Sequence, residues 1–539
     1  MSTAAPVPEI HTSEDEKLLH RLGYAQELLR AMGAFRNFAI SFTIISILAG
    51  CLTSYYLAFQ WGGPVSVEWG WIIVGTLTTF VALSMAEIAS TYPTAGGLYY
   101  WSSKLGNAGW GWFTGWFNLI GLIGIVGAVG YYLAIFATSF FNLLWGYPND
   151  RHHIFYLFVG LMALAMLVNV FDVRITSLIN AISAYWHVIG VLIIVFACII
   201  VPDTHQSASY VFTQTINNSG FSGHGWGSGV FWMVFAIGSI GMAQYTLTGY
   251  DASAHMAEET HKASRSAALG MIWAVVGSVI AGFVLLTAIT FAIPDQKAVQ
   301  GQFAYITTYI WQGSMGTHWA EVLLFIVVCA QFYCLTACMT SGSRMLFAFS
   351  RDRATPGHTY WRKVSRHRVP AIACFAVGTA AFLLLLPTWW NSLTGYYVGT
   401  SVGTTGLYIA FILPVILRFR QGTNFQPGAW SLGKHYKWIN PIAMVWVLFI
   451  TVIFMLPTSP GGIPWNAAWD TAAGGWDFVN YAPLTIGFAF VLFTGWWILS
   501  ARKWFVGPVR MGTDEELERL EAEQEKQFLL PADTAYQST

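Results

Sequence analysis

FAISFTIISILAGCLTSYYLAF (residues 38–59) and FAIGSIGMAQYTLTGYDASAHMAEET (residues 235–260) are apolar segments, each interrupted near its middle by small or polar residues. The first is interrupted around Gly50 and the second around Gly249. Helices broken at corresponding positions of two halves are the sequence sign of an inverted repeat inside a membrane. The pair therefore predicts an all-α membrane protein built from two similar halves.

Charged residues are scarce throughout the chain. Of 539 residues, 55% are apolar and 10% are charged, and the mean hydropathy is +0.53. A soluble protein carries about 25% charged residues, so this chain lacks the polar surface of a soluble globule. We expect the lipid bilayer to be its solvent. No basic stripe stands clear of the helix ends, so nothing indicates a nucleic acid partner.

Twelve apolar runs are long enough to cross a bilayer, which takes about 20 residues in a helix. We therefore predict a polytopic all-α protein with twelve transmembrane helices. Their expected ranges are 35–59, 67–91, 109–145, 153–171, 177–201, 230–256, 267–293, 319–347, 370–388, 395–418, 439–457 and 481–504.

The distribution of Lys and Arg predicts the orientation in the membrane, because cytoplasmic loops are enriched in both. With the N-terminus in the cytoplasm, the outer loops keep only Arg151 and Lys297 of the 26 Lys and Arg residues. We expect a multi-pass protein of the cell (plasma) membrane with both termini in the cytoplasm.

The two interruptions also predict a binding site. Unwound backbone is tolerated inside a membrane only around a polar cavity. The N-terminal ends of half-helices attract a carboxylate, and freed carbonyl groups accept hydrogen bonds from an ammonium group. A single glycine is more often a packing point, so the prediction depends on the matched pair and on Asp251 beside the second break.

The third apolar run carries glycines at every third position. They are Gly121, Gly124, Gly127 and Gly130. Such a stripe lets another helix backbone approach closely, so we expect it to serve packing.

No metal or cofactor is expected. All six cysteines lie within apolar runs and lack the spacing of a zinc site or a disulfide framework. The sequence has no GxxxxGK[ST] motif for ATP. Because His, Asp and Cys do not cluster at catalytic spacing inside the runs, we expect the protein not to be an enzyme.

The sequence resembles a known superfamily of permeases. ALSMAEIASTYPTAGGLYYWSS (82–103) resembles the loop motif after the second helix in the amino acid–polyamine–organocation superfamily, and TLTGYDASAHMAEET (246–260) is similar to its broken sixth helix. ISFTIISILAG (40–50) followed by the loop motif resembles the amino acid/choline branch. That branch includes fungal GABA permeases, choline permeases and plant bidirectional amino acid transporters.

The resemblance implies a five-plus-five inverted repeat of the LeuT type with two extra helices. The expected divisions are a cytoplasmic tail at 1–34, a first repeat at 35–201, an extracellular loop at 202–229, a second repeat at 230–420, the two extra helices at 421–505 and a cytoplasmic tail at 506–539.

The same resemblance places the substrate site at the two breaks. The implied residues are Leu48, Ala49, Gly50, Cys51, Tyr245, Thr246, Leu247, Thr248, Gly249 and Tyr250. Many relatives have a Gly-x-Gly sequence at the first break, where this chain has Ala-Gly-Cys, so the unwinding point is left open. Glu87, in the loop motif, is expected to shape the cytoplasmic side.

Some members of the superfamily are proton-coupled and place a titratable group on the fifth helix. Here that helix reads ITSLINAISAYWHVIGVLIIVF (175–196), and His187 is its one side chain that titrates near neutral pH. The alternative is a hydrogen-bonded core histidine. Asp251 is expected to cap the second half-helix, and Asp251 and Glu87 are the next candidates for coupling.

These observations predict secondary-active transport of an amino acid or related amine, GABA-like, coupled to protons and working by alternating access. The expected partners are the small-molecule substrate, the proton and the lipid bilayer. A choline or polyamine permease, or a non-transporting nutrient sensor on the same fold, are the alternatives.

Overall fold

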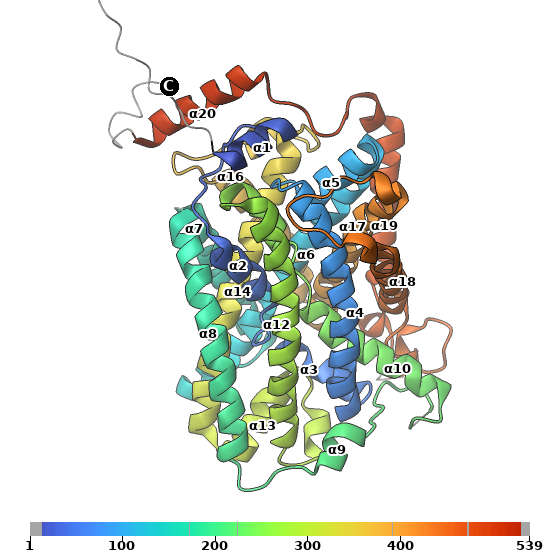
Figure 1. Ribbon diagram of the computed structural model, residues 1–539. Coiled ribbons are helices and arrows are strands. Elements are labelled where there is room, and N and C mark those ends of the chain that lie inside the picture. Colours follow the sequence, from blue (N-terminus) through green and yellow to red (C-terminus); the bar gives the residue numbers. More distant parts are fainter. Residues whose placement is uncertain (1–12, 172, 224, 391, 472–473, 530–539) are drawn as a thin grey trace, which may run out of the picture.

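The regular structure of the protein is helical. The computed structural model describes residues 13–529 apart from 172, 224, 391 and 472–473 (Figure 1). Its first half contains α1 (Glu14–Leu22), α2 (Ala34–Ile45), α3 (Gly50–Gln60), α4 (Pro64–Thr91), α5 (Gly97–Leu105), α6 (Ala108–Trp145), α7 (Arg151–Val170), α8 (Val173–Ile200) and α9 (Ala208–Thr213). The second half contains α10 (Gly229–Ser239), the π-helical turn η1 (Ile240–Gln244), α11 (Ala252–His255), α12 (Ala263–Phe291), α13 (Ile306–Met315), α14 (Thr317–Arg351), α15 (His358–Trp361), α16 (Ala371–Leu385), α17 (Ser392–Gln421), α18 (Tyr436–Met455), α19 (Ala482–Leu499) and α20 (Asp514–Leu529).

Eleven helical segments of the described chain are long and apolar enough to cross a membrane. They coincide with the predicted runs except the sixth, 230–256. That run is interrupted, and its longest apolar helix, Gly229–Gln244, is shorter than a full span. A multi-pass membrane protein is therefore confirmed, while the count of twelve and the division into repeats stay predictions.

The long helices α6 and α14 form the centre of the bundle. They have 38 and 35 residues, and at about 1.5 Å per residue both exceed the apolar thickness of a bilayer, about 30 Å. Helix α6 packs against α14, α16 and α17. A Cβ at Gly124 would lie 2.6 Å from the backbone nitrogen of Gly403 on α17. The glycine stripe on α6 thus serves close helix packing, as predicted.

The molecule has two distinct ends. Helices α1 and α20 lie together at one end, here called the terminal face, and α9 and α13 lie at the opposite end, the far face (Figure 1). A contact of 2.8 Å between His20 Nε2 and Glu521 Oε1 joins α1 to α20.

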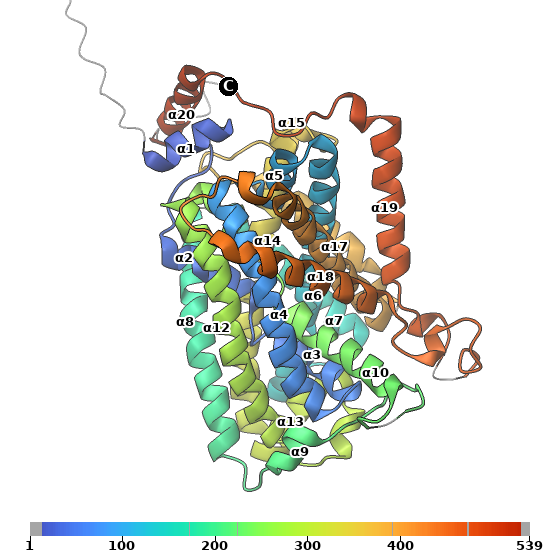
Figure 2. The ribbon, with the colours of Figure 1, turned by 45° about the vertical axis from the view of Figure 1, so that its right-hand side comes forward.

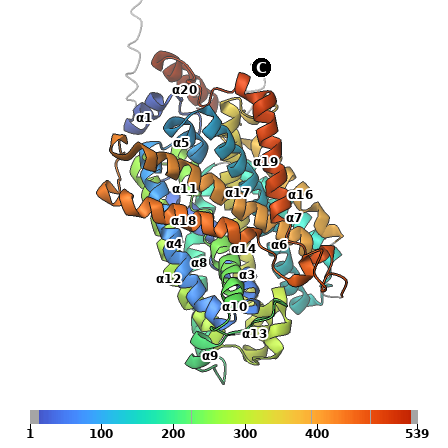
Figure 3. The same cartoon turned by 90° about the vertical axis from the view of Figure 1, so that its right-hand side faces the viewer.

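Helices α18 and α19 lie on the outside of the bundle, where Figure 2 and Figure 3 show them from two sides. Leu448 on α18 is 67% exposed and Phe488 on α19 is 70% exposed. Apolar side chains this exposed suit contact with lipid rather than water.

Candidate substrate site

The first apolar run is broken between α2 and α3. Helix α2 ends at Ile45, and Ser46 adopts a left-handed φ of 38° before α3 begins at Gly50. The backbone N–H groups of Ala49 and Gly50 both donate to the carbonyl of Ser46, at 2.8 and 2.7 Å. The break therefore lies at Ser46–Ala49, about one turn earlier than Ala49-Gly50-Cys51 suggested, because Ser46 and not a glycine takes the left-handed conformation.

The second break lies where the sequence predicted it. The π-helical turn η1 ends at Gln244, the chain unwinds after Thr246, and α11 begins at Ala252. Gly249 has φ +103°, and a Cβ there would lie 2.1 Å from Ile44 Cγ2. Only glycine fits this backbone, both for its conformation and for its closeness to α2.

The two broken helices touch directly. A Cβ on Gly50 would approach Thr246 Cγ2 to 2.6 Å and the Thr246 Cα to 2.9 Å. The N-terminal end of α3 therefore faces the end of the helix that contains η1. A helix N-terminus carries partial positive charge and a C-terminus partial negative charge, so opposed polarities meet at this point inside the membrane.

A small cavity of about 20 Å³ lies between the breaks. That volume admits about one water molecule, so the site is contracted in this conformation. Its walls come from α2, α3, α6, the second break and α14. The lining residues are Ile44, Ile45, Ala49, Gly50, Thr53, Ile125, Val129, Tyr132, Tyr245, Thr246, Thr248, Gln331 and Cys334.

Half of the predicted site residues line this cavity. They are Ala49, Gly50, Tyr245, Thr246 and Thr248. The others do not: Leu48, Cys51, Leu247, Gly249 and Tyr250 are buried in the packing around the breaks. For Cys51 the difference follows from helical geometry, because successive residues of α3 point in different directions and only one face meets the cavity.

Gln331, on α14, is a cavity residue that the sequence reasoning missed. Its side chain is 1% exposed, and among the described residues neither its amide nitrogen nor its amide oxygen has a hydrogen-bond partner. A buried amide without partners is costly and calls for a ligand or water. The signal in the sequence was a lone glutamine inside the apolar stretch LLFIVVCAQFYCL (323–335).

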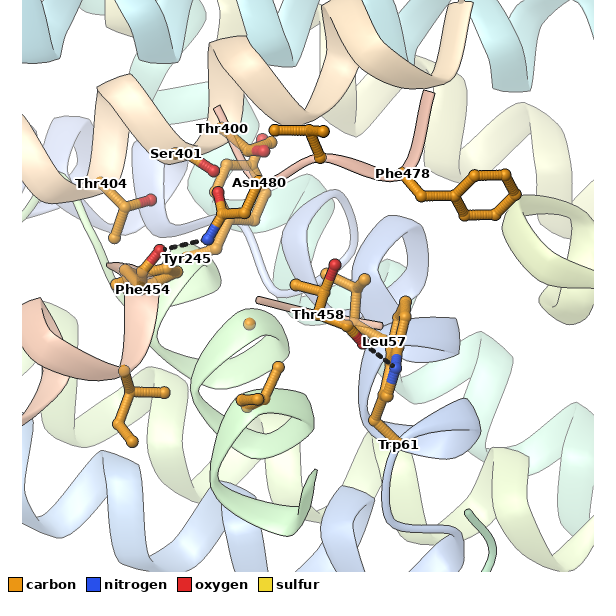
Figure 4. A pocket seen from close by; sticks show the side chains of 14 residues that line it. Leu57, Trp61, Tyr245, Thr400, Ser401, Thr404, Phe454, Thr458, Phe478 and Asn480 are labelled. Carbon is orange, nitrogen blue, oxygen red and sulfur yellow. Dashed lines mark hydrogen bonds between the residues drawn. The ribbon is translucent and has the colours of Figure 1, made fainter. Parts of the chain in front are cut away.

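A second, larger cavity of about 70 Å³ lies on the far-face side of the breaks. Figure 4 shows its lining, in which Thr400, Ser401 and Thr404 of α17 face Tyr245 and Asn480. Tyr245 lines both cavities, so its ring lies between the contracted site and the wider space beyond it.

His187 lies beside the first break, as the sequence reasoning required of a coupling residue. Its Nε2 is 2.6 Å from Ser46 Oγ, and its Nδ1 is 2.7 Å from the carbonyl oxygen of Ser183. A carbonyl can only accept, so Nδ1 carries a proton. In a neutral ring Ser46 Oγ–H then donates to Nε2, so that both ring nitrogens are hydrogen-bonded.

The side chain of Asp251 does not cap α11, contrary to expectation. Asp251 has helical backbone angles, φ −64° and ψ −15°, and its side chain accepts no capping hydrogen bond. A capping residue takes an extended conformation that brings its side chain over the first turn. Instead, Asp251 Oδ2 lies 3.3 Å from His255 Nε2 and 3.5 Å from Asn118 Nδ2.

Glu87 lies on the terminal-face side of the bundle, away from the cavity. Its carboxylate accepts from Arg418 Nε at 2.8 Å and from the Leu432 backbone N–H at 3.0 Å. The loop motif that follows it packs on the second broken helix, where His255 Nδ1 donates to the Ala95 carbonyl at 2.9 Å. The motif thus braces the second broken helix on the terminal-face side.

Buried ion pairs lie on the terminal-face side of the second break. Arg344 Nε on α14 meets Glu259 Oε1 at 2.7 Å, and Arg351 on the same helix meets Glu258 at 2.8 Å. Asp352 accepts from the hydroxyl of Tyr24, in the segment before α2, at 2.7 Å. Together these contacts tie α14 to the chain that follows α11 and to the N-terminal segment.

Comparison with known proteins identifies a matching family and several relatives. A family model described as amino acid permease matches residues 32–490. An amino-acid permease BAT1 homolog of Oryza sativa subsp. japonica is 35% identical over 513 residues, covering 91% of this chain and 95% of the relative. Amino-acid permease BAT1 of Arabidopsis thaliana is 34% identical with the same coverage. A GABA-specific permease of Saccharomyces cerevisiae is 25% identical over 528 residues, covering 93% of this chain and 87% of the relative.

Proposed function

Because the chain belongs to the amino acid permease family, within the amino acid–polyamine–organocation superfamily, we propose that it carries small, GABA-like amino acids across the membrane by alternating access, driven by protons. The observation that carries this proposal is the cavity between the two helix breaks. It lies at the middle of the bundle, and polar backbone from both broken helices borders it.

The cavity suits a zwitterion. No charged residue is among those that line it, so a substrate without net charge leaves no charge unbalanced. The N-terminal end of α3 offers backbone N–H groups and partial positive charge to a carboxylate. The unwound carbonyls of the second break accept from an ammonium group. The free amide of Gln331 completes the polar contacts from a third helix.

The size of the cavity favours a small substrate. Any amino acid is larger than the one water molecule that the contracted cavity admits, so the cavity must open to bind it, and a small substrate such as GABA requires the least opening. A quaternary ammonium group prefers aromatic faces, and the rings of Tyr132 and Tyr245 lie 6.1 Å apart near the cavity. Choline is therefore the second candidate.

Proton coupling is assigned to His187. Its imidazole bonds to Ser46 inside the first break, so any movement of that break changes the partners of the ring. A proton drives transport only if the two conformations bind it with different affinity. The neutral, hydrogen-bonded ring represents one of those conformations. Asp251 beside His255 is the alternative carrier.

The orientation follows from the charge distribution. We place the terminal face, with both termini, in the cytoplasm and the far face outside the plasma membrane. The ion pairs of Arg344 and Arg351 then close the cytoplasmic side, and the larger cavity beyond Tyr245 lies toward the outside.

The test is net uptake by purified protein in proteoliposomes, with and without an inward proton gradient. The panel contains labelled GABA, alanine, glutamate, choline and putrescine. We expect saturable uptake of GABA or a small neutral amino acid, increased by the gradient. Gln331→Leu should reduce it, whereas Gly277→Ala should not, because a Cβ at Gly277 meets nothing within 4 Å. Uptake of choline or putrescine alone would contradict the proposed substrate class.

A further inference from the structure

Glu68, near the far-face end of α4, is buried, and no charged partner for it lies in the part of the chain that the structure describes. We propose that it is a proton-binding site, reached from outside through a groove between α8 and α12, that takes up and releases a proton during the transport cycle. The inference rests on the proposed proton-coupled transport but concerns a different group from His187 and a different depth in the membrane.

The carboxyl group of Glu68 is enclosed by protein. The residue is 0% exposed, and its Oε2 accepts a hydrogen bond of 2.6 Å from the Thr287 hydroxyl on α12. Its other oxygen, Oε1, has no hydrogen-bond partner among the described residues. An ionised carboxylate whose nearby donors are threonine hydroxyls, with no charged partner among the described residues, is costly to bury, and the group avoids that cost by holding a proton.

The groups around Glu68 are uncharged at neutral pH. Tyr55 of α3 is the titratable side chain that interacts with Glu68, and Tyr210 of α9 and Cys198 of α8 in turn interact with Tyr55. No ion pair to Glu68 is present in the described chain, so protonation alone neutralises the site. The ordinary pKa values of a tyrosine and a thiol lie above neutral pH, so the carboxyl is the group among these that we infer to exchange the proton.

A groove of about 480 Å³ lies next to the site, between α8 and α12. Six of its eight lining residues are apolar, and Thr287 and His205 are the two that can carry a proton. His205 is exposed in the loop before α9, and its Nε2 lies 2.9 Å from the Cys198 carbonyl oxygen. A hydroxyl that accepts one proton while donating another can relay it, so Thr287 connects the groove to Glu68. Glu68 lies four residues after Pro64, the first residue of α4. At 1.5 Å per residue this places it about 6 Å from the far-face end of that helix.

The site is linked to the moving parts of the substrate site. On α12, Thr290 lies three residues after Thr287, and its hydroxyl is 2.8 Å from the Tyr55 hydroxyl on α3. Helix α3 begins at Gly50, in the cavity wall. Any displacement of α3 on substrate binding therefore disturbs the α3–α12 contact one turn from Thr287. The surroundings of Glu68 then differ between the two conformations, so each can bind the proton with a different affinity, as coupling requires.

Uptake measurements on Glu68→Gln test the proposal, since the amide oxygen still accepts from Thr287 but the group can no longer bind or release a proton. Glu321→Gln is the matched control, because Glu321 lies at the far-face end of α14 beside His318, away from the groove. We expect the several-fold stimulation by an inward proton gradient to be lost in Glu68→Gln, with exchange of substrate retained, and to persist in the control. His205→Gln should slow gradient-driven uptake without abolishing it.

Infrared spectroscopy supplies a readout that does not depend on transport. The parent protein should show the carbonyl stretch of a buried protonated carboxyl group, and Glu68→Gln should lack that band.

If Glu68→Gln does not fold, Thr287→Val takes its place. Because this change removes a hydrogen-bond donor to the ionised form of Glu68, it should move the half-maximal pH of uptake upward. Unchanged gradient-driven uptake in Glu68→Gln, or an unchanged pH profile in Thr287→Val, would overturn the proposal. If either outcome occurs while His187→Gln loses gradient-driven uptake, the proposed proton-coupled transport stands and only the role of Glu68 is wrong.

Discussion

Ser46 Oγ and His187 Nε2 lie 2.6 Å apart, so a residue in the break of the first transmembrane helix is held by the fifth. The backbone of Ser46 is left-handed, and its hydroxyl also accepts from the Ala49 N–H at 3.2 Å. The hydrogen bonds that fix the conformation of the break therefore include one to an imidazole, a group that can gain or lose a proton.

His187→Gln should separate coupling from transport. The amide can replace one ring hydrogen bond but cannot gain a charge, so exchange of substrate between loaded vesicles should continue while accumulation driven by a pH gradient is lost. Parallel measurements of exchange and net uptake check this. Accumulation against a gradient at the parent level would leave Asp251 as the carrier, or a transporter that needs no proton.

Gly50→Ala should strongly reduce transport. The new Cβ would lie 2.6 Å from Thr246 Cγ2 and 2.9 Å from the Thr246 backbone, so the two breaks must move apart at the cavity. Gly277→Ala and Gly487→Ala place the same methyl group where nothing lies within 4 Å. Initial uptake rates, normalised to protein in the vesicles, compare the three. Equal rates would show that the contact between the breaks is not part of the site.

Glu259→Gln should destabilise the closed terminal face. The change leaves the buried guanidinium of Arg344, 0% exposed, without its charged partner, which costs about 3–5 kcal/mol in other proteins. We expect a lower melting temperature in detergent, largely restored in the double variant Glu259→Gln/Arg344→Met. Failure of the double variant to recover would show that the two residues do not act as a pair.

Asp352 should make stability depend on pH. Burial, its largest influence, raises the pKa of Asp352 to about 6, whereas an unfolded aspartate titrates near 3.9. The folded protein therefore binds more protons between these values, and the stabilisation from this group is lost as pH rises from about 4 to about 6. The melting temperature of the parent minus that of Asp352→Asn should fall over this window. A constant difference would contradict the assignment.

Cysteine labelling should establish the orientation. In a background without native cysteines, Ala298→Cys is exposed on the far face and His367→Cys on the terminal face. An impermeant maleimide added to intact cells should label the first and not the second until the membrane is opened. The reverse pattern would place the termini outside.

Much of the fold could be predicted from sequence because its signals are local. A spanning helix needs only a run of apolar residues, and Gly249 could mark the second break because its positive φ and close approach to Ile44 both require glycine. The first break was placed less well. Ser46 bends the chain there, and its partner His187 comes from a helix more than 100 residues away.

Contacts between distant segments account for the features that sequence reasoning missed. Gln331 reads as one polar residue in an apolar run, and only the assembled bundle shows its amide without partners at the cavity. The expected cap at Asp251 was wrong for a local reason: the backbone at that residue is helical, and its side chain lies 3.3 Å from His255, four residues further along. Glu68 reads as one carboxylate near the start of an apolar run, and only the assembled bundle shows that it is buried and bonded to Thr287 of α12.

Counterflow tests most directly the claim that the paired helix breaks form an amino acid transport site. The assay requires neither a proton gradient nor knowledge of the direction of transport. Vesicles containing the purified protein are loaded with unlabelled GABA or a small neutral amino acid and diluted into a trace of the labelled compound. We predict a transient accumulation of label above equilibrium, abolished by Gly50→Ala and retained in His187→Gln. If no amino acid in the panel shows counterflow in the parent protein, the account of the paired helix breaks as an amino acid transport site is wrong.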